Sequence, residues 1–293
     1  MKIRKDFDDN SQLHNSTNKE SWIAFFILCI IVVIALVPLV WIIISSFKVD
    51  AEINKAGGFM FLPKTWTLSN YKEILAFSNK QLPVYNWFLN SIIVSGSQTI
   101  IAVTIYAMSA YAYSKLNFKG RDIIFLGIMF LSSFPAITNV IPLYKIMHTF
   151  GWLNDLIALI IPGLAGVLNI FLIRQFMYAI PDVILESARI DGAKEWRIFT
   201  RVVLPNCKPI LIAVGLFTFT GSWNDFLWPS IVINNIDRLT LTAGLQLAKG
   251  VYGNQVARMC TIATIAIIPM IILYLFTQKY FVKGISLDSG VKG

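Results

Sequence analysis

The sequence predicts an all-α membrane protein, a polytopic bundle of six transmembrane helices. Hydrophobic residues make up 56% of its 293 residues and charged residues only 14%, whereas soluble domains carry about 25% charged residues. The mean hydropathy is correspondingly high, at +0.65. Apolar runs of about 20 residues, the length that crosses a bilayer as a helix, recur along the chain. Together these features indicate an integral membrane protein.

The first predicted span runs from Trp22 to Phe47 without a charged residue. At 1.5 Å per residue this run would form roughly 39 Å of helix, enough to cross a bilayer with some tilt. It is too long for the core of a signal peptide, and no A-x-A cleavage site follows it, so we expect it to be retained. Residues 1–21 are polar and mixed in charge, and we predict that they form a loose cytoplasmic tail.

A polar segment, residues 48–86, separates the first span from the rest, and its stretch "TLSNYKEIL" predicts a short helix. Five further spans are predicted at residues 87–114, 122–147, 153–176, 204–230 and 257–281. The second span is rich in serine, glycine and alanine, which let helices approach closely in lipid, so we expect it inside the bundle. The predicted parts of the chain are a tail (1–21), a transmembrane domain (22–281) and a cytoplasmic C-terminal tail (282–293).

The distribution of bases predicts the orientation of these spans. Most lysine and arginine residues fall within four regions, residues 2–19, 115–121, 174–208 and 279–292. All four face the cytoplasm if both termini lie there and the chain crosses six times, in line with the positive-inside rule. The net charge of +9 is therefore assigned to cytoplasmic loops rather than to a surface that binds nucleic acid.

A charged segment, residues 180–205, lies between the fourth and fifth predicted spans. It carries eight charged residues between Asp182 and Arg201, and each would cost about 2.5–3.5 kcal/mol at the centre of a bilayer. Nevertheless its apolar residues recur with helical spacing, namely Val183, Ile184, Ala188, Trp196, Phe199 and Val203. The segment is thus predicted to form helices at the cytoplasmic surface.

The dipeptide Asp191-Gly192 divides the charged segment into two short predicted helices. Glycine allows positive φ at a sharp turn, and aspartate can cap the helix that follows. An amphipathic helix of this kind can lie on lipid headgroups. Because acids and bases are balanced here, attraction to anionic lipid is weak, and a partner protein is the better explanation of the apolar face.

The charged segment resembles the signature loop of ABC-importer permeases, whose pattern is E-A-A, three residues, G, nine residues, I-x-L-P. Here the pattern reads Glu186-Ser187-Ala188, then Gly192, then Val202-Val203-Leu204-Pro205, with the same spacing. Ser187 and Val202 are mild departures from it. The stretches "TLSNYKEIL", "SWNDFLWP" and the ending "SGVKG" are similar to carbohydrate-uptake permeases of the maltose-transporter type. The resemblance covers residues 22–293.

This resemblance implies a permease subunit of an ATP-driven, binding-protein-dependent sugar importer in the plasma membrane of a prokaryote. The subunit would form half of the pore, with a second, different permease subunit, an ATPase dimer and an extracellular solute-binding protein as partners in the lipid bilayer. The charged segment would be the coupling helix that docks on the ATPase. The residues implied for this coupling are Glu186, Ser187, Ala188, Asp191, Gly192, Ala193, Trp196, Phe199, Leu204 and Pro205.

Within this coupling role, individual side chains have distinct expected tasks. Glu186 is expected to pair with a base on the ATPase. Trp196 and Phe199 are expected to pack the segment onto the membrane domain.

The sequence offers no ATP chemistry of its own. It contains no G-x-x-x-x-G-K-[ST] motif and no Gly-Lys dipeptide, so ATP and Mg²⁺ are expected on the partner ATPase and no cofactor on this chain. Two histidines, His14 and His148, and three scattered cysteines suggest neither a metal site nor a disulfide framework. We therefore expect a transport subunit rather than an enzyme.

Proteins hold sugars with aromatic rings and with hydrogen bonds from amides and hydroxyls. The candidate residues for a solute path are Trp223, Asn224, Asp225, Trp228, Asn90, Asn139 and Asn169. Tryptophan at a span end is also a common interfacial anchor, and a lone asparagine often ties helices together. Residues 231–254 are predicted as an outer loop that faces the binding protein.

Two alternative functions remain open. The first is an importer of the same class for a polyamine, phosphate or peptide. The second is a membrane scaffold or a channel, in which a docking loop would have no purpose.

Overall fold

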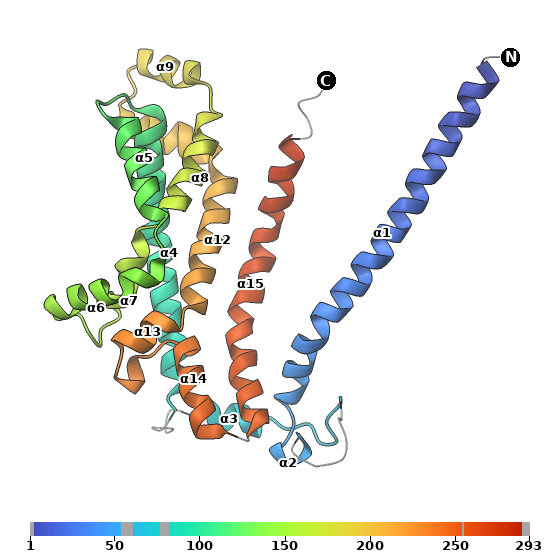
Figure 1. Cartoon of the computed structure of the whole chain (residues 1–293), viewed down its shortest axis with the longest axis vertical. Helices are drawn as coiled ribbons and strands as arrows, with labels where there is room; N and C mark the ends of the chain where they lie inside the picture. Colours follow the sequence, from blue (N-terminus) through green and yellow to red (C-terminus); the bar gives the residue numbers. More distant parts are fainter. Residues whose placement is uncertain (1–2, 54–60, 77–81, 254, 289–293) are drawn as a thin grey trace. The chain divides into compact units, whose positions relative to one another are not determined.

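The computed structural model describes residues 3–53, 61–76, 82–253 and 255–288, and within these ranges every regular element is a helix (Figure 1). The predicted all-helical membrane fold is thus confirmed. The chain divides into two compact units. The first comprises Met1–Tyr71 and Asn254–Thr264, and the second comprises Lys72–Gly253 and Ile265–Gly293.

The first unit is dominated by one long helix, α1 (Ile3–Ser45). Residues 3–21, predicted as a loose tail, are helical and continuous with the first span. The physical reason is that neither glycine nor proline occurs before Pro38 to interrupt the helix. Beyond Ser45 the chain turns into α2 (Asp50–Ile53), and the Asn70 amide donates hydrogen bonds to the carbonyls of Ser46 (3.0 Å) and Lys48 (2.8 Å).

Within the described ranges, three single helices are long and apolar enough to cross a membrane, at Trp22–Ser45, Val84–Lys115 and Val256–Lys279. The last of these belongs to α15 (Val256–Asp288), so residues 282–288 of the predicted C-terminal tail are also helical. The other three predicted spans are broken helix pairs, so the number of spans reaches six only if each pair counts as one.

The three broken pairs are bent by 90°, 45° and 80°. The first joins α5 (Arg121–Ser132) to α6 (Val140–Thr149) through η1 (Ala136–Asn139). The second joins α7 (Ile157–Ile160) and η2 (Pro162–Leu164) to α8 (Val167–Tyr178). The third leads from residues 195–206 into α12 (Lys208–Asn224). Prolines 135, 162, 205 and 209 lie at or near these breaks, where the missing N–H weakens the helix.

Helix α4 (Val84–Lys115) is the centre of the second unit and packs against α8 and α12. Its small residues Ser91, Ser95, Ala102, Ala107 and Ala110 are buried, as their composition predicts. Its C-terminal half shares one hydrophobic core with the charged segment. That core includes Tyr106, Tyr111, Ile173, Met177, Leu185, Ile198, Phe199, Val203 and Val214.

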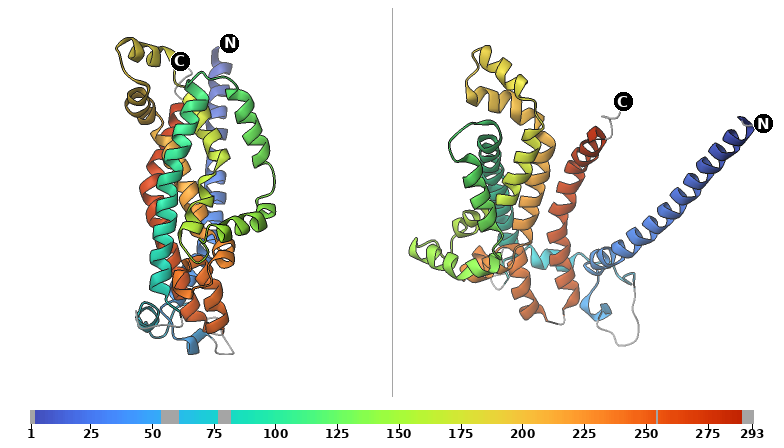
Figure 2. Two further views of the ribbon diagram at one scale, coloured as in Figure 1. Left: turned by 90° about the vertical axis from the view of Figure 1, so that its left-hand side faces the viewer. Right: turned by 45° about the horizontal axis from the view of Figure 1, so that its top comes forward.

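The two ends of the second unit carry different elements (Figures 1 and 2). The charged segment at one end forms α9 (Asp182–Ile190), α10 (Glu195–Ile198), the π-helical turn η3 (Phe199–Val203) and α11 (Leu204–Asn206). The other end carries α13 (Leu227–Val232), η4 (Ile236–Arg238) and α14 (Leu241–Tyr252). Residues 231–254, predicted as an outer loop, are therefore mostly helical in the described part.

The segment containing η4 and α14 is held firmly on α4. The Trp87 indole donates a 2.6 Å hydrogen bond to the carbonyl of Ile236. A Cβ atom built on Gly244 would lie 2.3 Å from the Trp87 ring, so only glycine allows α14 to approach this closely. The segment predicted as an outer loop thus contains an amphipathic helix, α14, which covers one end of α4.

Candidate functional site

The turn in the charged segment is a helix C-cap built on Gly192. Gly192 has φ +78°, as predicted. Its N–H donates to the Arg189 carbonyl, and the Ala193 N–H donates to the Ala188 carbonyl, each at 3.0 Å. This pair of bonds is a Schellman motif with glycine at the first position beyond the cap. The predicted role of Asp191 as the cap of the following helix is wrong, because Asp191 instead ends α9 and Lys194 occupies that cap position.

The charged segment has one apolar face in the core and a second apolar face exposed. Leu185, Ile198 and Phe199 are buried, and the Phe199 ring centre lies 5.1 Å from that of Tyr111. Ser187 and Glu186 are exposed, and Ala188 and Ala193 are half-buried against the core. The apolar residues that remain exposed are Val183, Ile184, Ile190 and Trp196.

The predicted packing stripe of the charged segment is thus only partly correct. Phe199 and Val203 pack against the membrane domain, whereas Trp196 is 64% exposed and contacts Phe199 only from outside, at 5.5 Å between ring centres. The physical reason is that helical spacing brings two apolar stripes onto α9 and α10. Only the stripe that contains Leu185 and Ile198 faces the core.

Lys115, at the end of α4, joins the bundle to the start of α9. Its side chain is only 2% exposed, and its Nζ atom donates to the Ile180 carbonyl at 2.6 Å and to Asp182 Oδ1 at 2.7 Å. The hydrogen bond from Lys115 lowers the pKa of the Asp182 carboxyl below its ordinary value. This buried ammonium group therefore has both of these hydrogen-bond partners at the base of the charged segment.

A second polar connection joins α4, α9 and α10 through Glu195. The Tyr111 hydroxyl donates to Glu195 Oε2 at 2.6 Å, and the Arg189 guanidinium donates to Glu195 Oε1 at 2.7 Å. The Glu195 carboxylate thus joins α10, to which it belongs, to α9 and to α4. Sequence reasoning missed Tyr111, Lys115 and Glu195, because 65 or more residues separate the two α4 side chains from their partners and no local pattern signals such a pairing.

Leu204 and Pro205 mark the elbow where the charged segment enters the bundle. Leu204 packs partly buried against the core, and Pro205 is exposed in the short helix α11. After Asn206 the chain bends by 80° into α12. The charged segment is therefore connected directly to α12, a helix that packs on α4.

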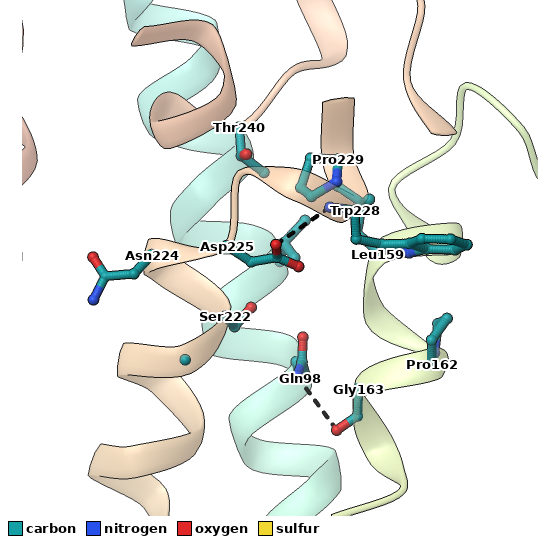
Figure 3. A pocket seen from close by; sticks show the side chains of 12 residues that line it. Gln98, Leu159, Pro162, Gly163, Ser222, Asn224, Asp225, Trp228, Pro229 and Thr240 are labelled. Atoms are coloured by element: carbon teal, nitrogen blue, oxygen red, sulfur yellow. Dashed lines mark hydrogen bonds between the residues drawn. The ribbon is translucent and has the colours of Figure 1, made fainter. Parts of the chain in front are cut away.

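A polar cavity of about 470 Å³ lies in the second unit between α4, η2, α12 and α13 (Figure 3). Twelve residues line it, namely Val94, Gln98, Leu159, Pro162, Gly163, Gly221, Ser222, Asn224, Asp225, Trp228, Pro229 and Thr240. Its volume falls within the range of about 300–1,000 Å³ that is typical of small-molecule sites. Of the predicted path residues, Asn224, Asp225 and Trp228 line the cavity.

The side chains around the polar cavity are held by specific bonds. Asp225 Oδ1 accepts the backbone N–H groups of Leu227 (3.1 Å) and Trp228 (3.3 Å) at the start of α13. The Trp228 indole donates to the Ala158 carbonyl at 2.8 Å, which fixes its ring at the wall. In Figure 3 Asp225 and Gln98 point toward the same open space, whereas Asn224 points away from it.

The remaining predicted path residues lie elsewhere. Trp223 is 2% exposed, and its indole donates to the Ala266 carbonyl at 3.1 Å, so it is a core residue. The Asn90 amide donates to the carbonyls of Asp237 and Leu239 and ties α4 to the η4 region. Asn169 reaches Thr218 Oγ1 at 3.5 Å, and Asn139 is exposed in η1. None of these four is among the residues that line the cavity.

Known proteins similar to this chain are inner-membrane transport components. The family model described as "Binding-protein-dependent transport system inner membrane component" matches residues 106–287. The chain is 32% identical over 274 residues to the arabinooligosaccharides transport system permease protein AraQ of Halalkalibacterium halodurans, covering 93% of this chain and 97% of that protein.

Two further similarities extend this finding. The chain is 31% identical over 258 residues to the diacetylchitobiose uptake system permease protein NgcG of Streptomyces coelicolor, covering 87% of this chain and 83% of that protein. Among solved structures, a chain of a bacterial ABC transporter involved in the import of the acidic polysaccharide alginate matches with a TM-score of 0.78 and 26% identity. That match covers 91% of this chain and 98% of the other.

Proposed function

Because this chain belongs to the family of binding-protein-dependent transport system inner membrane components, we propose that it is one permease subunit of an ATP-driven sugar importer. It forms half of the pore together with a second, different permease subunit. An ATPase dimer on the cytoplasmic side supplies ATP and Mg²⁺ chemistry, and an extracellular binding protein delivers the sugar. Both termini and the charged segment lie in the cytoplasm of a prokaryotic cell.

The observation that carries this proposal is that the charged segment has two apolar faces, one buried and one exposed. Its buried face is seated in the core, yet Val183 and Ile190 on the other side of α9 remain 70% and 87% exposed. Four acids and four bases around them keep the segment out of the bilayer. An exposed apolar face with a balanced polar rim is suited to a groove on a soluble protein, and the ATPase is the occupant we assign to it.

The polar connections of the charged segment support a coupling role. A docked ATPase can move the bundle only if the segment transmits displacement without yielding. Lys115 and the Tyr111–Glu195–Arg189 connection bind the segment to α4, and the 80° elbow continues it into α12. ATP-driven closure of the ATPase pair would then be transmitted to the two helices at the centre of the unit as a rigid-body change.

The sugar class of the substrate is supported by the relatives. AraQ is named for arabinooligosaccharides and NgcG for diacetylchitobiose, and the matching solved transporter imports alginate. These are all saccharides, although they differ in ring type and charge. A non-sugar solute such as a polyamine, phosphate or peptide is the alternative that a transport assay would reveal.

The test is co-purification of the ATPase and binding-protein-stimulated ATP hydrolysis with Gly192→Val and Glu186→Lys. A β-branched residue at φ +78° is strained by roughly 1–2 kcal/mol and thickens the exposed turn. Lysine at position 186 reverses the charge expected at the ATPase contact. Both variants should insert and pair with the second permease, yet lose most ATPase association and stimulated hydrolysis.

Gly151→Val is the matched control for this test. Gly151 also has positive φ (+69°) and open space around its Cβ position, but it lies between α6 and α7, away from the charged segment. It should therefore carry the same local strain and retain ATPase association. Normal coupling in both charged-segment variants, or equal loss in the control, would show that the segment is only a surface helix.

A further inference from the structure

Acids and bases are balanced over the whole charged segment, but they are not evenly distributed along it. Residues 182–191, which contain α9, carry three acids and one base, whereas residues 194–208 carry four bases and one acid. We infer that the basic half binds an anionic phospholipid of the adjacent leaflet, with an acyl chain beside Trp196 and the headgroup on Arg197 and Arg201. This lipid site is additional to the proposed function and does not depend on which solute is carried.

An apolar cavity of about 220 Å³ lies where α10 and η3 meet the end of α4. It is lined by Met108, Tyr111, Leu116, Glu195, Trp196 and Phe199. Met108 is 46% exposed and lies seven residues, about 10 Å, before the end of the membrane span Val84–Lys115. A soluble partner does not reach this depth within a bilayer, whereas lipid acyl chains surround a span there.

Trp196 is the most exposed apolar residue of this lining. Its ring packs on the buried Phe199 at 5.5 Å between ring centres, yet 64% of Trp196 remains exposed. Tryptophan is enriched where hydrocarbon meets water, because its ring is apolar and its N–H group is polar. An exposed indole beside the end of a span is therefore suited to the boundary between acyl chains and headgroups.

A row of bases lies on the exposed side of the same stretch. Lys194, Arg197 and Arg201 have the spacing i, i+3 and i+7, which places them on one helical face. All three are exposed, and their side chains form no ion pair with any residue that the structure describes. Bases in this position attract the anionic headgroups of a membrane surface.

Glu195, the single acid of the basic half, has its charge compensated within the chain. Its Oε1 atom accepts a hydrogen bond from the Arg189 guanidinium at 2.7 Å, and its Oε2 atom accepts one from the Tyr111 hydroxyl at 2.6 Å. The carboxylate is therefore not free to repel a phosphate. An apolar cavity within a span, next to unpaired bases at its end, is complementary to a molecule that carries both an acyl chain and a phosphate.

The test is photocrosslinking of the intact complex in phosphatidylcholine nanodiscs. The probe is phosphatidylglycerol or phosphatidylcholine with a diazirine in one acyl chain, at a mole fraction low enough that labelling is proportional to affinity. Mass spectrometry locates the labelled peptides. We expect the phosphatidylglycerol probe to label the peptides that contain Met108 and Trp196 several times more strongly than the phosphatidylcholine probe.

Charge variants test the headgroup contact. Arg201→Gln should lower the phosphatidylglycerol labelling roughly fivefold, the value of one base near a membrane surface, and Arg201→Lys should retain it because the charge is kept. The double change Arg197→Gln and Arg201→Gln should lower it to the phosphatidylcholine level. Lys119→Gln is the matched control, since Lys119 is an exposed base near the same end of α4 but does not line the cavity. It should leave the labelling unchanged.

A bulky substitution tests the acyl-chain contact. Met108→Trp should fill part of the cavity and lower labelling of the Trp196 peptide by both probes. Ile100→Trp is its control, because Ile100 lies on the same helix and is 71% exposed but does not line the cavity. It should label like wild type.

Three results would overturn the lipid site. They are equal labelling by the two probes, unchanged labelling in the double arginine variant, and absence of label at Met108 and Trp196 in the intact complex. The last result would mean that the ATPase or the second permease covers this face. Co-purification of the ATPase is measured on the same samples. If the ATPase is absent while the labelling is as expected, the proposed function fails and the lipid site stands.

Discussion

The charged segment and the polar cavity differ in how their polar groups are satisfied. At the charged segment, both oxygens of Glu195 and the Lys115 ammonium of α4 that bonds to its start have partners within 2.7 Å. Around the cavity, the Gln98 oxygen and the second oxygen of Asp225 have none among the described residues. A set of polar groups that is satisfied internally favours one fixed arrangement. Acceptors that face open space without a partner remain available to donors from outside the chain.

The largest expected effect tests whether the side chains around the cavity are tightly packed, although some of their oxygens lack hydrogen-bond partners. A Cβ atom at Gly163 would lie 2.0 Å from Gln98 Nε2, so Gly163→Ala should destabilise the protein by about 3 kcal/mol. The same change in a Gln98→Ala background should cost far less, because the obstructing amide is gone. Thermal unfolding in detergent micelles measures both.

Gly221→Ala is the control for the Gly163 substitution. Gly221 lines the same cavity, but no atom lies within 4 Å of its Cβ position. Its substitution should leave the unfolding temperature nearly unchanged. Equal destabilisation by Gly163→Ala with and without Gln98 would mean that the clash is relieved elsewhere and that Gln98 is not held against Gly163.

The second prediction removes the α4 lysine that bonds to the start of the charged segment. Lys115→Met should cost about 2 kcal/mol, because the Ile180 carbonyl loses its donor in a buried place. It should also reduce stimulated ATP hydrolysis. Lys119→Met, an exposed lysine four residues further on, is the control and should behave like wild type. An equally stable Lys115→Met variant would show that this buried lysine does not hold the start of α9.

The third prediction weakens the Glu195 connection with a minimal change. Tyr111→Phe keeps the ring contact with Phe199 but removes the hydroxyl that donates to Glu195, and should cost about 1 kcal/mol. Tyr113→Phe is a control, since the Tyr113 ring packs on Phe125 and its backbone carbonyl, not its hydroxyl, accepts the bond from Arg174. Chemical denaturation should rank Tyr111→Phe below both wild type and the control.

The smallest effect is expected for Asp182→Asn. Asp182 is exposed, and pairs of this kind contribute about 0–1 kcal/mol. Because its pKa is lowered in the folded protein, the stabilisation is present above the ordinary carboxyl pKa and is lost as the pH falls through the lowered value. The difference from wild type should thus be constant between pH 5 and 8 in thermal unfolding. A difference that changes within this window would contradict the lowered pKa.

Features written in local sequence were predictable, and those that depend on distant contacts were not. The positive φ of Gly192 was predictable because a glycine between two helical patterns marks a turn. The short helix predicted in "TLSNYKEIL" is present as α3 (Ser69–Ile74). The burial of α4 followed from its small residues. In contrast, the pairing of Lys115 with Asp182 spans 67 residues and leaves no periodic signal.

The breaks in the predicted spans and the open acceptors of the cavity show the same limit. Membrane helices tolerate proline when neighbours satisfy the freed carbonyls, so Pro135 and Pro162 do not by themselves distinguish a straight span from a bent one. Thr240 sits at an ordinary N-cap position in sequence. Its hydroxyl lacks a hydrogen-bond partner because of how α14 packs on α4. No local sequence pattern indicates this packing.

The 80° elbow before α12 has a mechanical consequence. Helix α12 is a rod of 17 residues, about 25 Å long, hinged at one end to the charged segment and ending at the cavity. A rotation of about 10° at the hinge would sweep the far end of a rod of this length through about 4 Å, more than the length of a hydrogen bond. A small rotation at the elbow would therefore be large enough to make or break contacts at Ser222 and Asp225.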